Sequence, residues 1–434
     1  MIKRILYTLL IMFPVVASAQ INTDRVMAIG RNALYFEDYV LSIQYFNQVI
    51  NAKPYLSDPY FYRGLAKINL DDFQGAESDC SEAIERNPFV VSAYQVRGLA
   101  RIQQNNFAGA IEDYTKALEF DPENIGVWHN MALCRIRQED YKGAKNDLDK
   151  LIAISPRYTK AYLMRGEVDL KQKDTLAAEK DFGKAIEIDR YDADTWASRA
   201  ILRLQQQRYK DAEADFDHAI RLSTRNSGVY INRALARYHQ NNLRGAMSDY
   251  DIALDIDPNN FIGHYNRGLL RAQVGDDNRA IQDFNFVIEM EPDNMMAIFN
   301  RGLLLDQTGD YKGAIKDYST VINEYPNFLL GYQYRAQARR KIGDVKGADA
   351  DEFKVLKAQL DKQNGVDPNK QTADNTENNK TRKKSDKNMN NYRKIVVADN
   401  EEGEEKNKSD YRGRVQDKNV NIVPQPMFVL TYYE

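Results

Sequence analysis

Proline recurs at a constant spacing along most of this chain. Seven prolines stand on one 34-residue grid, at Pro54, Pro88, Pro122, Pro156, Pro258, Pro292 and Pro326. The two grid points between Pro156 and Pro258 hold Arg190 and Thr224, so the period continues there without its proline. A fixed period of this length is the signature of one supersecondary unit stacked many times. We therefore expect a repeat protein rather than a single globular core.

Other positions of the 34-residue unit are also constant in size. With Thr23 as position 1, position 8 is glycine or alanine in all ten units, and position 20 is alanine in every unit except the first, which has Ser42. Position 24 is bulky in most units and position 4 is usually aromatic. Small side chains at two fixed points let two helices approach closely, with the bulky side chain between them. Polar turns separate two amphipathic runs in each unit, and the proline follows the second run because it cannot continue a helix.

This pattern resembles the tetratricopeptide repeat over roughly residues 23–362. The resemblance implies an all-α fold, a right-handed superhelical solenoid of about ten helix-turn-helix repeats, with the first helix of each pair lining a concave groove. We expect the solenoid to occupy residues 20–362. Its first and last repeats depart from the pattern, as suits capping units that face water.

Charged residues recur within the unit. Position 7 is arginine in eight repeats and position 23 is aspartate in nine. One interpretation is a basic ladder for phosphate or polysaccharide. At 100° per residue, however, positions 4, 7, 8 and 11 share the stripe that faces the second helix. We therefore expect each arginine to pair with an aspartate at the interface between the two helices.

The opposite side of the first helix is the candidate peptide-binding groove. Position 6 carries asparagine in four repeats, at Asn130, Asn232, Asn266 and Asn300. An amide side chain both donates and accepts, so a ladder of asparagines can hold a peptide backbone whatever its sequence. Aromatic residues accompany the ladder, at Phe61, Tyr62, Tyr265, Phe299 and Tyr334. The alternative is that these side chains only pack against the neighbouring helix.

The two ends of the chain differ from the repeats. Residues 1–19 have the charged start, apolar run and Ala17-Ser18-Ala19 site of a cleaved signal peptide, which predicts export to the periplasm or, alternatively, secretion. Residues 363–414 are polar and charged, which predicts a disordered linker. Residues 415–434 end in an apolar, aromatic stretch, which predicts a short extended segment that docks on a partner or on the protein's own groove, unless it too is merely disordered.

Several function classes find no support in the composition. Basic and acidic residues are nearly balanced, 60 against 63, so we expect no nucleic-acid partner. The four histidines fit no zinc spacing, Cys80 and Cys134 lie two repeats apart, and no catalytic or phosphate-binding motif occurs. We expect no enzyme, no cofactor, no metal and no transmembrane span.

The leading hypothesis is therefore a protein-interaction scaffold of the cell envelope that binds extended polypeptide. One alternative is a glycan- or peptidoglycan-binding module that uses Tyr62, Tyr265 and Phe299 as stacking platforms. Another is an accessory subunit of an envelope assembly or secretion complex.

Overall fold

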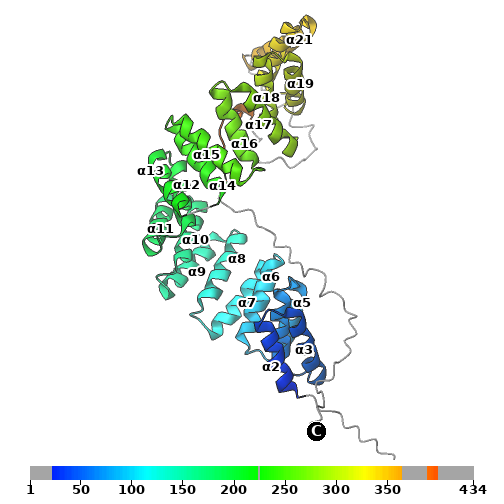
Figure 1. Ribbon diagram of the computed structural model, residues 1–434, viewed down its shortest axis with the longest axis vertical. Helices are drawn as coiled ribbons and strands as arrows, with labels where there is room; N and C mark the ends of the chain where they lie inside the picture. The colour runs from blue at the N-terminus through cyan, green and yellow to red at the C-terminus, as the bar shows by residue number, and fades with distance from the viewer. Residues whose placement is uncertain (1–21, 223–224, 364–388, 399–434) are drawn as a thin grey trace, which may run out of the picture. The chain divides into compact units, whose positions relative to one another are not determined.

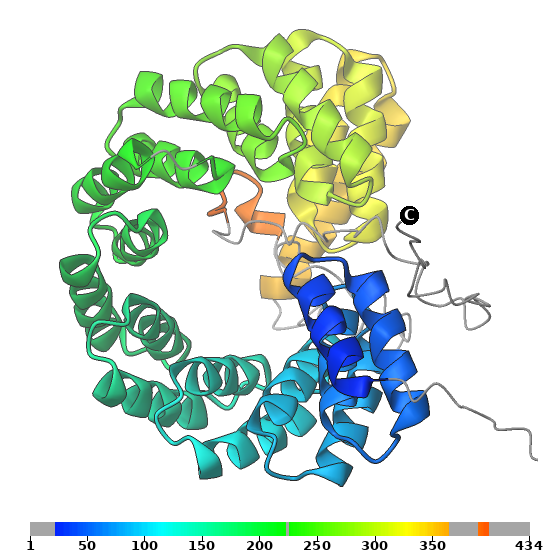
Figure 2. The same ribbon diagram turned by 60° about the horizontal axis from the view of Figure 1, so that its bottom comes forward.

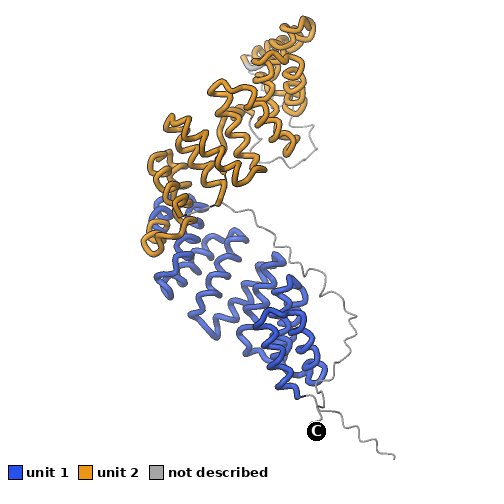
Figure 3. Tube along the Cα trace, in the orientation of Figure 1, with its two compact units in different colours: residues 1–181, 405–434 blue, residues 182–404 orange. Residues whose placement is uncertain are grey.

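The computed structural model describes residues 22–222, 225–363 and 389–398. These residues form 20 α-helices and one short 3₁₀-helix, and no strand occurs among them (Figure 1). The chain divides after Asp181 into two compact units, coloured separately in Figure 3 and described separately below.

The helices follow one another in antiparallel pairs, and each pair is one repeat. Unit 1 contains α2 (Thr23–Tyr35), α3 (Tyr39–Ala52), α4 (Asp58–Ile68), α5 (Phe73–Arg86), α6 (Val91–Gln103), α7 (Phe107–Phe120), α8 (Ile125–Arg137), α9 (Tyr141–Ile154), α10 (Thr159–Lys171) and the start of α11 (Thr175–Ile188). Unit 2 contains the rest of α11, then α12 (Ala193–Gln205), α13 (Tyr209–Arg221), α14 (Ser227–His239), α15 (Leu243–Ile256), α16 (Phe261–Gln273), α17 (Asp277–Met290), α18 (Met295–Thr308), α19 (Tyr311–Glu324), α20 (Leu329–Lys341), α21 (Val345–Gln363) and η2 (Met389–Asn391). The ten repeats predicted from the sequence are confirmed.

The turn between the two helices of a repeat has the same backbone feature in all ten repeats. Position 15 has a positive φ, between 59° and 93°, in every repeat, and three of these residues are glycine. The next residue is usually Asp or Asn, and its side chain caps the second helix. Asp72, for example, accepts a hydrogen bond of 2.9 Å from the backbone N–H of Gly75. Such a cap satisfies a backbone donor that has no partner inside the helix.

The small and bulky positions meet between the two helices of a repeat. A Cβ atom on Gly98 would lie 2.8 Å from the ring of Tyr114, closer than real contacts allow. The same holds for Gly30 and the ring of Phe46, at 2.7 Å. Both rings are fully buried. The predicted packing of position 8 against position 24 is confirmed, and it explains why position 8 stays small.

The arginines of position 7 pair with the aspartates of position 23 of the same repeat. The eight pairs are Arg63–Asp79, Arg97–Asp113, Arg165–Asp181, Arg199–Asp215, Arg233–Asp249, Arg267–Asp283, Arg301–Asp317 and Arg335–Asp351. All eight aspartates are buried. The interpretation as structural ion pairs is confirmed, and the arginines do not form a basic ladder on the surface.

Candidate functional site: an asparagine ladder with an extended segment on it

A segment from beyond the last repeat lies on the first helices of unit 2. Residues 389–398, called here the tail segment, begin with the 3₁₀ turn η2 and continue without regular secondary structure to Ala398. The segment is orange in Figure 2, where it runs beside the helices of unit 2. It contacts α14, α16 and α18 through the asparagines of position 6 in three consecutive repeats.

Two of these asparagines each make a pair of hydrogen bonds to one residue of the segment. Asn266 Nδ2 donates to the carbonyl of Val396 at 2.7 Å, and the Val396 N–H donates to Asn266 Oδ1 at 2.9 Å. Asn232 holds Ala398 in the same way, with both distances 2.9 Å. Each amide side chain therefore pairs with a backbone N–H and C=O as a neighbouring β-strand would. These four bonds involve no side chain of the segment.

The third asparagine holds the segment by a single carbonyl. Asn300 Nδ2 donates to the carbonyl of Tyr392 at 2.5 Å, and the hydroxyl of Tyr265 donates to the same oxygen at 2.7 Å. Asn300 Nδ2 also lies 2.9 Å from the carbonyl of Met296, in its own helix. The segment therefore runs against the order of the repeats, from α18 at Tyr392 to α14 at Ala398. We call Asn232, Asn266 and Asn300 the asparagine ladder.

Every third side chain of the segment is turned toward the helices. Met389 and Ala398 are each 4% exposed, and Tyr392 and Ile395 are partly buried, whereas all other side chains of the segment are exposed. The ring of Tyr392 meets the ring of Phe299 edge to face, with centroids 4.8 Å apart. Ala398 lies in the same apolar cluster as Ile231 and Leu270. A period of three is that of an extended polyproline-II-like chain.

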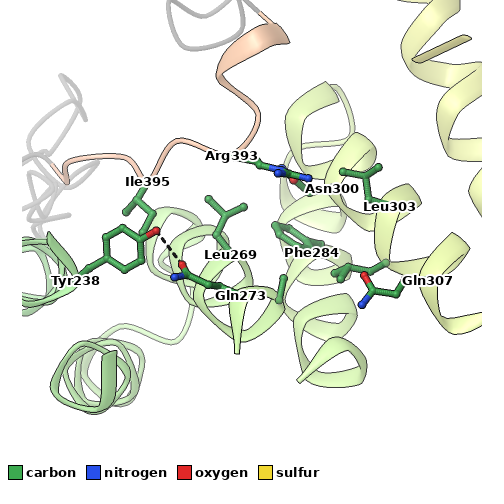
Figure 4. A pocket seen from close by; sticks show the side chains of 11 residues that line it. Tyr238, Leu269, Gln273, Phe284, Asn300, Leu303, Gln307, Arg393 and Ile395 are labelled. Carbon is green, nitrogen blue, oxygen red and sulfur yellow. Dashed lines mark hydrogen bonds between the residues drawn. The ribbon is translucent and has the colours of Figure 1, made fainter. Parts of the chain in front are cut away.

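A cavity of about 330 Å³ remains between the segment and the first helices (Figure 4). Arg393 and Ile395 border it from the segment. The helices contribute an apolar floor and a few polar groups, from Tyr238, Leu269, Ala272, Gln273, Phe284, Asn300, Leu303, Leu304 and Gln307. The hydroxyl of Tyr238 donates to Gln273 Oε1 at 2.8 Å. The tail segment therefore does not fill the surface on which it lies.

The structure separates the predicted site residues into two groups. Unit 2 brings together the asparagine ladder with Tyr265, Phe299 and Tyr334. The remaining three, Asn130, Phe61 and Tyr62, belong to unit 1, where Tyr62 stacks on Phe46. Binding of a partner by any of these residues stays a prediction.

Burial changes the interpretation of two aromatics. Tyr265 is 5% exposed and Phe299 is fully buried, with their rings against Phe284 and Tyr318. Neither offers an open face on which a sugar ring could stack. Tyr238, Gln273 and Gln307 border the cavity but were not among the predicted site residues. Tyr238 stands at position 12 of its repeat, and Gln273 and Gln307 stand at position 13 of theirs. This shared place in the first helix is the sequence signal that could have identified them.

The tail segment also corrects the predicted boundaries. Residues 389–398 lie within the interval 363–414 predicted as a disordered linker, yet they pack on unit 2, where the ladder bonds to the backbone of Tyr392, Val396 and Ala398. Ile395, Val396 and Val397, within this segment, form no strand. The predicted signal peptide 1–19 and docking segment 415–434 lie outside the described residues.

Chemically reactive side chains elsewhere in the described residues are held in packing or hydrogen-bond contacts. His264 lies within hydrogen-bonding distance of Asp283 and of the carbonyl of Pro258, and stacks on Phe286. Cys80 and Cys134 are buried and form no disulfide, and burial raises the pKa of each thiol to about 12. Within the described ranges, no cluster of His, Cys, Asp and Glu could hold a metal ion. No helix in the part of the chain that the structure describes is long and apolar enough to cross a membrane.

Paired helices in a repeating register, with the asparagine ladder on the first helices of three consecutive pairs, define a helical-repeat protein. Sequence profiles described as TPR repeat and tetratricopeptide repeat match residues 98–134, 125–158, 159–192, 198–261 and 265–327. The chain belongs to the tetratricopeptide repeat family.

Solved structures with similar folds include other tetratricopeptide repeat proteins. One from Parabacteroides merdae is 21% identical, covers 57% of this chain and 98% of its own, and has a TM-score of 0.45. The C-terminal part of one from Cytophaga hutchinsonii is 17% identical, covers 56% and 98%, and has a TM-score of 0.46. YrrB, described as having an unusual peptide-binding site, is 18% identical, covers 42% and 95%, and has a TM-score of 0.39. Comparison with curated proteins gave no match.

Proposed function

We propose that this protein is an interaction scaffold whose unit 2 binds an extended segment of a partner protein on the asparagine ladder. The supporting observation is the set of four hydrogen bonds from Asn232 and Asn266 to backbone groups of the tail segment. Every residue except proline offers the same N–H and C=O groups. A surface that pairs with backbone in this way suits peptides of many sequences, and the side-chain sites beside it would select among them.

We further propose that the scaffold works in the cell envelope, in the periplasm. The support is the signal-peptide pattern of residues 1–19. N-terminal sequencing of the protein recovered from its own cells tests this proposal. A mature chain that begins at Gln20 in the periplasmic fraction is the expected result, and a chain that retains Lys3 and Arg4 in the cytosol would contradict it.

Testing the ladder requires a chain whose own segment is displaced. In the full chain, Tyr392→Ala removes the ring that packs on Phe299, and Ala398→Arg places a long charged side chain where Ala398 is 4% exposed. Both substitutions lie outside the helical repeats, so the helices should keep their circular dichroism. We call this double variant the displaced chain.

The assay is binding of a labelled synthetic peptide of residues 387–400 to the displaced chain, followed by fluorescence anisotropy. We expect saturable binding that weakens about ten-fold or more when Asn232→Ala or Asn266→Ala is added, because each change removes two hydrogen bonds of about 1 kcal/mol each. Asn130→Ala, the same position of a repeat in unit 1, is the matched control and should leave binding unchanged. The proposal is wrong if the peptide fails to bind, or if Asn130→Ala weakens binding as much as Asn266→Ala.

A further inference from the structure

The contacts between the tail segment and the asparagine ladder also indicate which side chains a partner segment would carry. We infer that the tail segment is an internal occupant that fills the ladder incompletely, and that the partner segment carries a larger apolar side chain at the place of Ile395. This inference rests on the proposed function and names the ligand class and the competition at that same site.

The first step is competition for the same atoms. Asn232 and Asn266 each use both amide atoms on the tail segment, and the Asn300 amide donates to the carbonyl of Tyr392. A partner backbone cannot form these bonds while the segment is in place. The segment belongs to the same chain, so its effective concentration at the ladder is set by the tether and commonly reaches the millimolar range. A partner must therefore bind better than the segment does.

The second step is where a partner could bind better. The cavity of about 330 Å³ lies beside Ile395, and Leu269, Phe284 and Leu303 contribute to its wall. Apolar surface that a ligand leaves uncovered contributes nothing to its affinity, and each additional buried methylene strengthens binding several-fold. An aromatic ring at the place of Ile395 would extend into this space (Figure 4).

The third step is the spacing of the anchors. Tyr392 packs on Phe299, Ile395 borders the cavity, and Ala398 is buried near Ile231 and Leu270. These three positions are three residues apart. The partner segment is thus an extended stretch with an aromatic residue, then a large apolar residue three positions later, then a small residue three positions after that. The residues between the anchors have exposed side chains in the tail segment, but Arg393 also borders the cavity, so only the other three are expected to vary freely.

Four peptides of residues 387–400 test the inference: the natural sequence, Ile395→Phe, Ile395→Ala and Ala398→Trp. Each is titrated into the displaced chain and into the wild-type chain. On the displaced chain we expect Ile395→Phe to bind three- to ten-fold tighter than the natural peptide, Ile395→Ala to bind more weakly, and Ala398→Trp to lose binding. On the wild-type chain the natural, Ile395→Phe and Ile395→Ala peptides should each bind at least ten-fold more weakly than on the displaced chain.

Each contrary result identifies the step that is wrong. If Ile395→Phe binds no tighter than the natural peptide, the cavity is not the partner's site. If the wild-type and displaced chains bind a peptide equally, the segment does not compete. Either result leaves the proposed function standing, whereas failure of all four peptides on the displaced chain would overturn the proposed function itself.

A second measurement needs no added peptide. In the full chain, Ile395→Phe should slow hydrogen exchange of the Val396 and Ala398 amides, both of which donate to the ladder. Faster exchange would show that a ring does not fit beside Ile395 and would overturn the inference.

Discussion

The fourth and ninth repeats, α8–α9 and α18–α19, carry the same asparagine at position 6 and differ in the residue that follows it. In the ninth repeat, Asn300 is followed by Arg301, which donates two hydrogen bonds to the buried Asp317, at 2.8 and 2.7 Å. In the fourth repeat, Asn130 is followed by Met131. The carboxylate of Asp147 then has Arg135 on one oxygen, at 2.8 Å, and no hydrogen-bond partner on Oδ2.

The two asparagines also differ in the residues that stand at position 6 of the neighbouring repeats. Asn300 is the last of three asparagines that stand at position 6 in consecutive repeats. The repeats before and after that of Asn130 hold Val96 and Met164 at this position. An extended backbone needs partners at successive places, so a single amide does not make a ladder. The comparison shows that one repeat motif serves two independent purposes. Position 7 holds the helix pair together, and position 6 holds the tail segment where asparagine recurs in consecutive repeats.

The largest effect is expected for Arg301→Met, which makes the ninth repeat resemble the fourth. Position 11 of this repeat is Leu305, so no second arginine stands there to compensate Asp317. Removing one partner of a buried pair costs about 3–5 kcal/mol, because the other charge is left buried. We expect a corresponding fall in the urea midpoint, and faster hydrogen exchange in α18 and α19.

The matched control is Arg267→Met in the eighth repeat. There, Asp283 keeps Arg271 at 2.7 Å and His264 at 3.0 Å, so the loss of stability should be smaller. An equal loss in the two variants would show that compensation of the carboxylate is not what the arginine provides.

The sequence was sufficient for these helix pairs because their signals are local and repeated. Positions 7 and 23 lie 16 residues apart in every repeat, and positions 8 and 24 show the same regularity. The tail segment gave no comparable signal. Ala398 bonds to Asn232, 166 residues away, and does so through its backbone, which leaves no mark in the choice of side chain. The buried or partly buried residues of the segment recur every third position, at Met389, Tyr392, Ile395 and Ala398. This period is the sequence signal that could have indicated a packed segment within a polar stretch.

An intermediate effect is expected for Met131→Arg, which makes the fourth repeat resemble the ninth. Burial raises the pKa of Asp147 from 3.8 to about 6, although Arg135 and Lys150 act in the opposite direction. Between these two pH values the folded chain binds more protons than the unfolded chain. The free energy of unfolding therefore falls as pH rises from about 4 to about 6, by something on the order of 1–3 kcal/mol.

The new arginine should pair with Asp147, as its equivalents do, and reach Thr115 on α7. The cavity of about 440 Å³ bordered by Thr115, Met131 and Asp147 is the place that it would occupy. We expect the variant to melt higher at pH 7 and to lose this part of the pH dependence. Asp147→Asn, which cannot ionise, should also lose it. Urea unfolding at pH 4, 5, 6 and 7 measures the slope, and an unchanged slope in Met131→Arg would contradict the assignment to Asp147.

The smallest effect is expected where the ladder is redundant. Asn300→Ala removes one hydrogen bond to the Tyr392 carbonyl, but the hydroxyl of Tyr265 still donates to that oxygen. Affinity of the displaced chain for the 387–400 peptide should fall only about five-fold, the value of roughly 1 kcal/mol. Tyr265→Phe alone should be similar, whereas the double variant should lose more than the two single losses combined, because the carbonyl then has neither donor. If the losses of affinity are additive, the two donors act independently. If Asn300→Ala weakens binding as much as Asn266→Ala does, the number of backbone hydrogen bonds does not set the strength of the ladder.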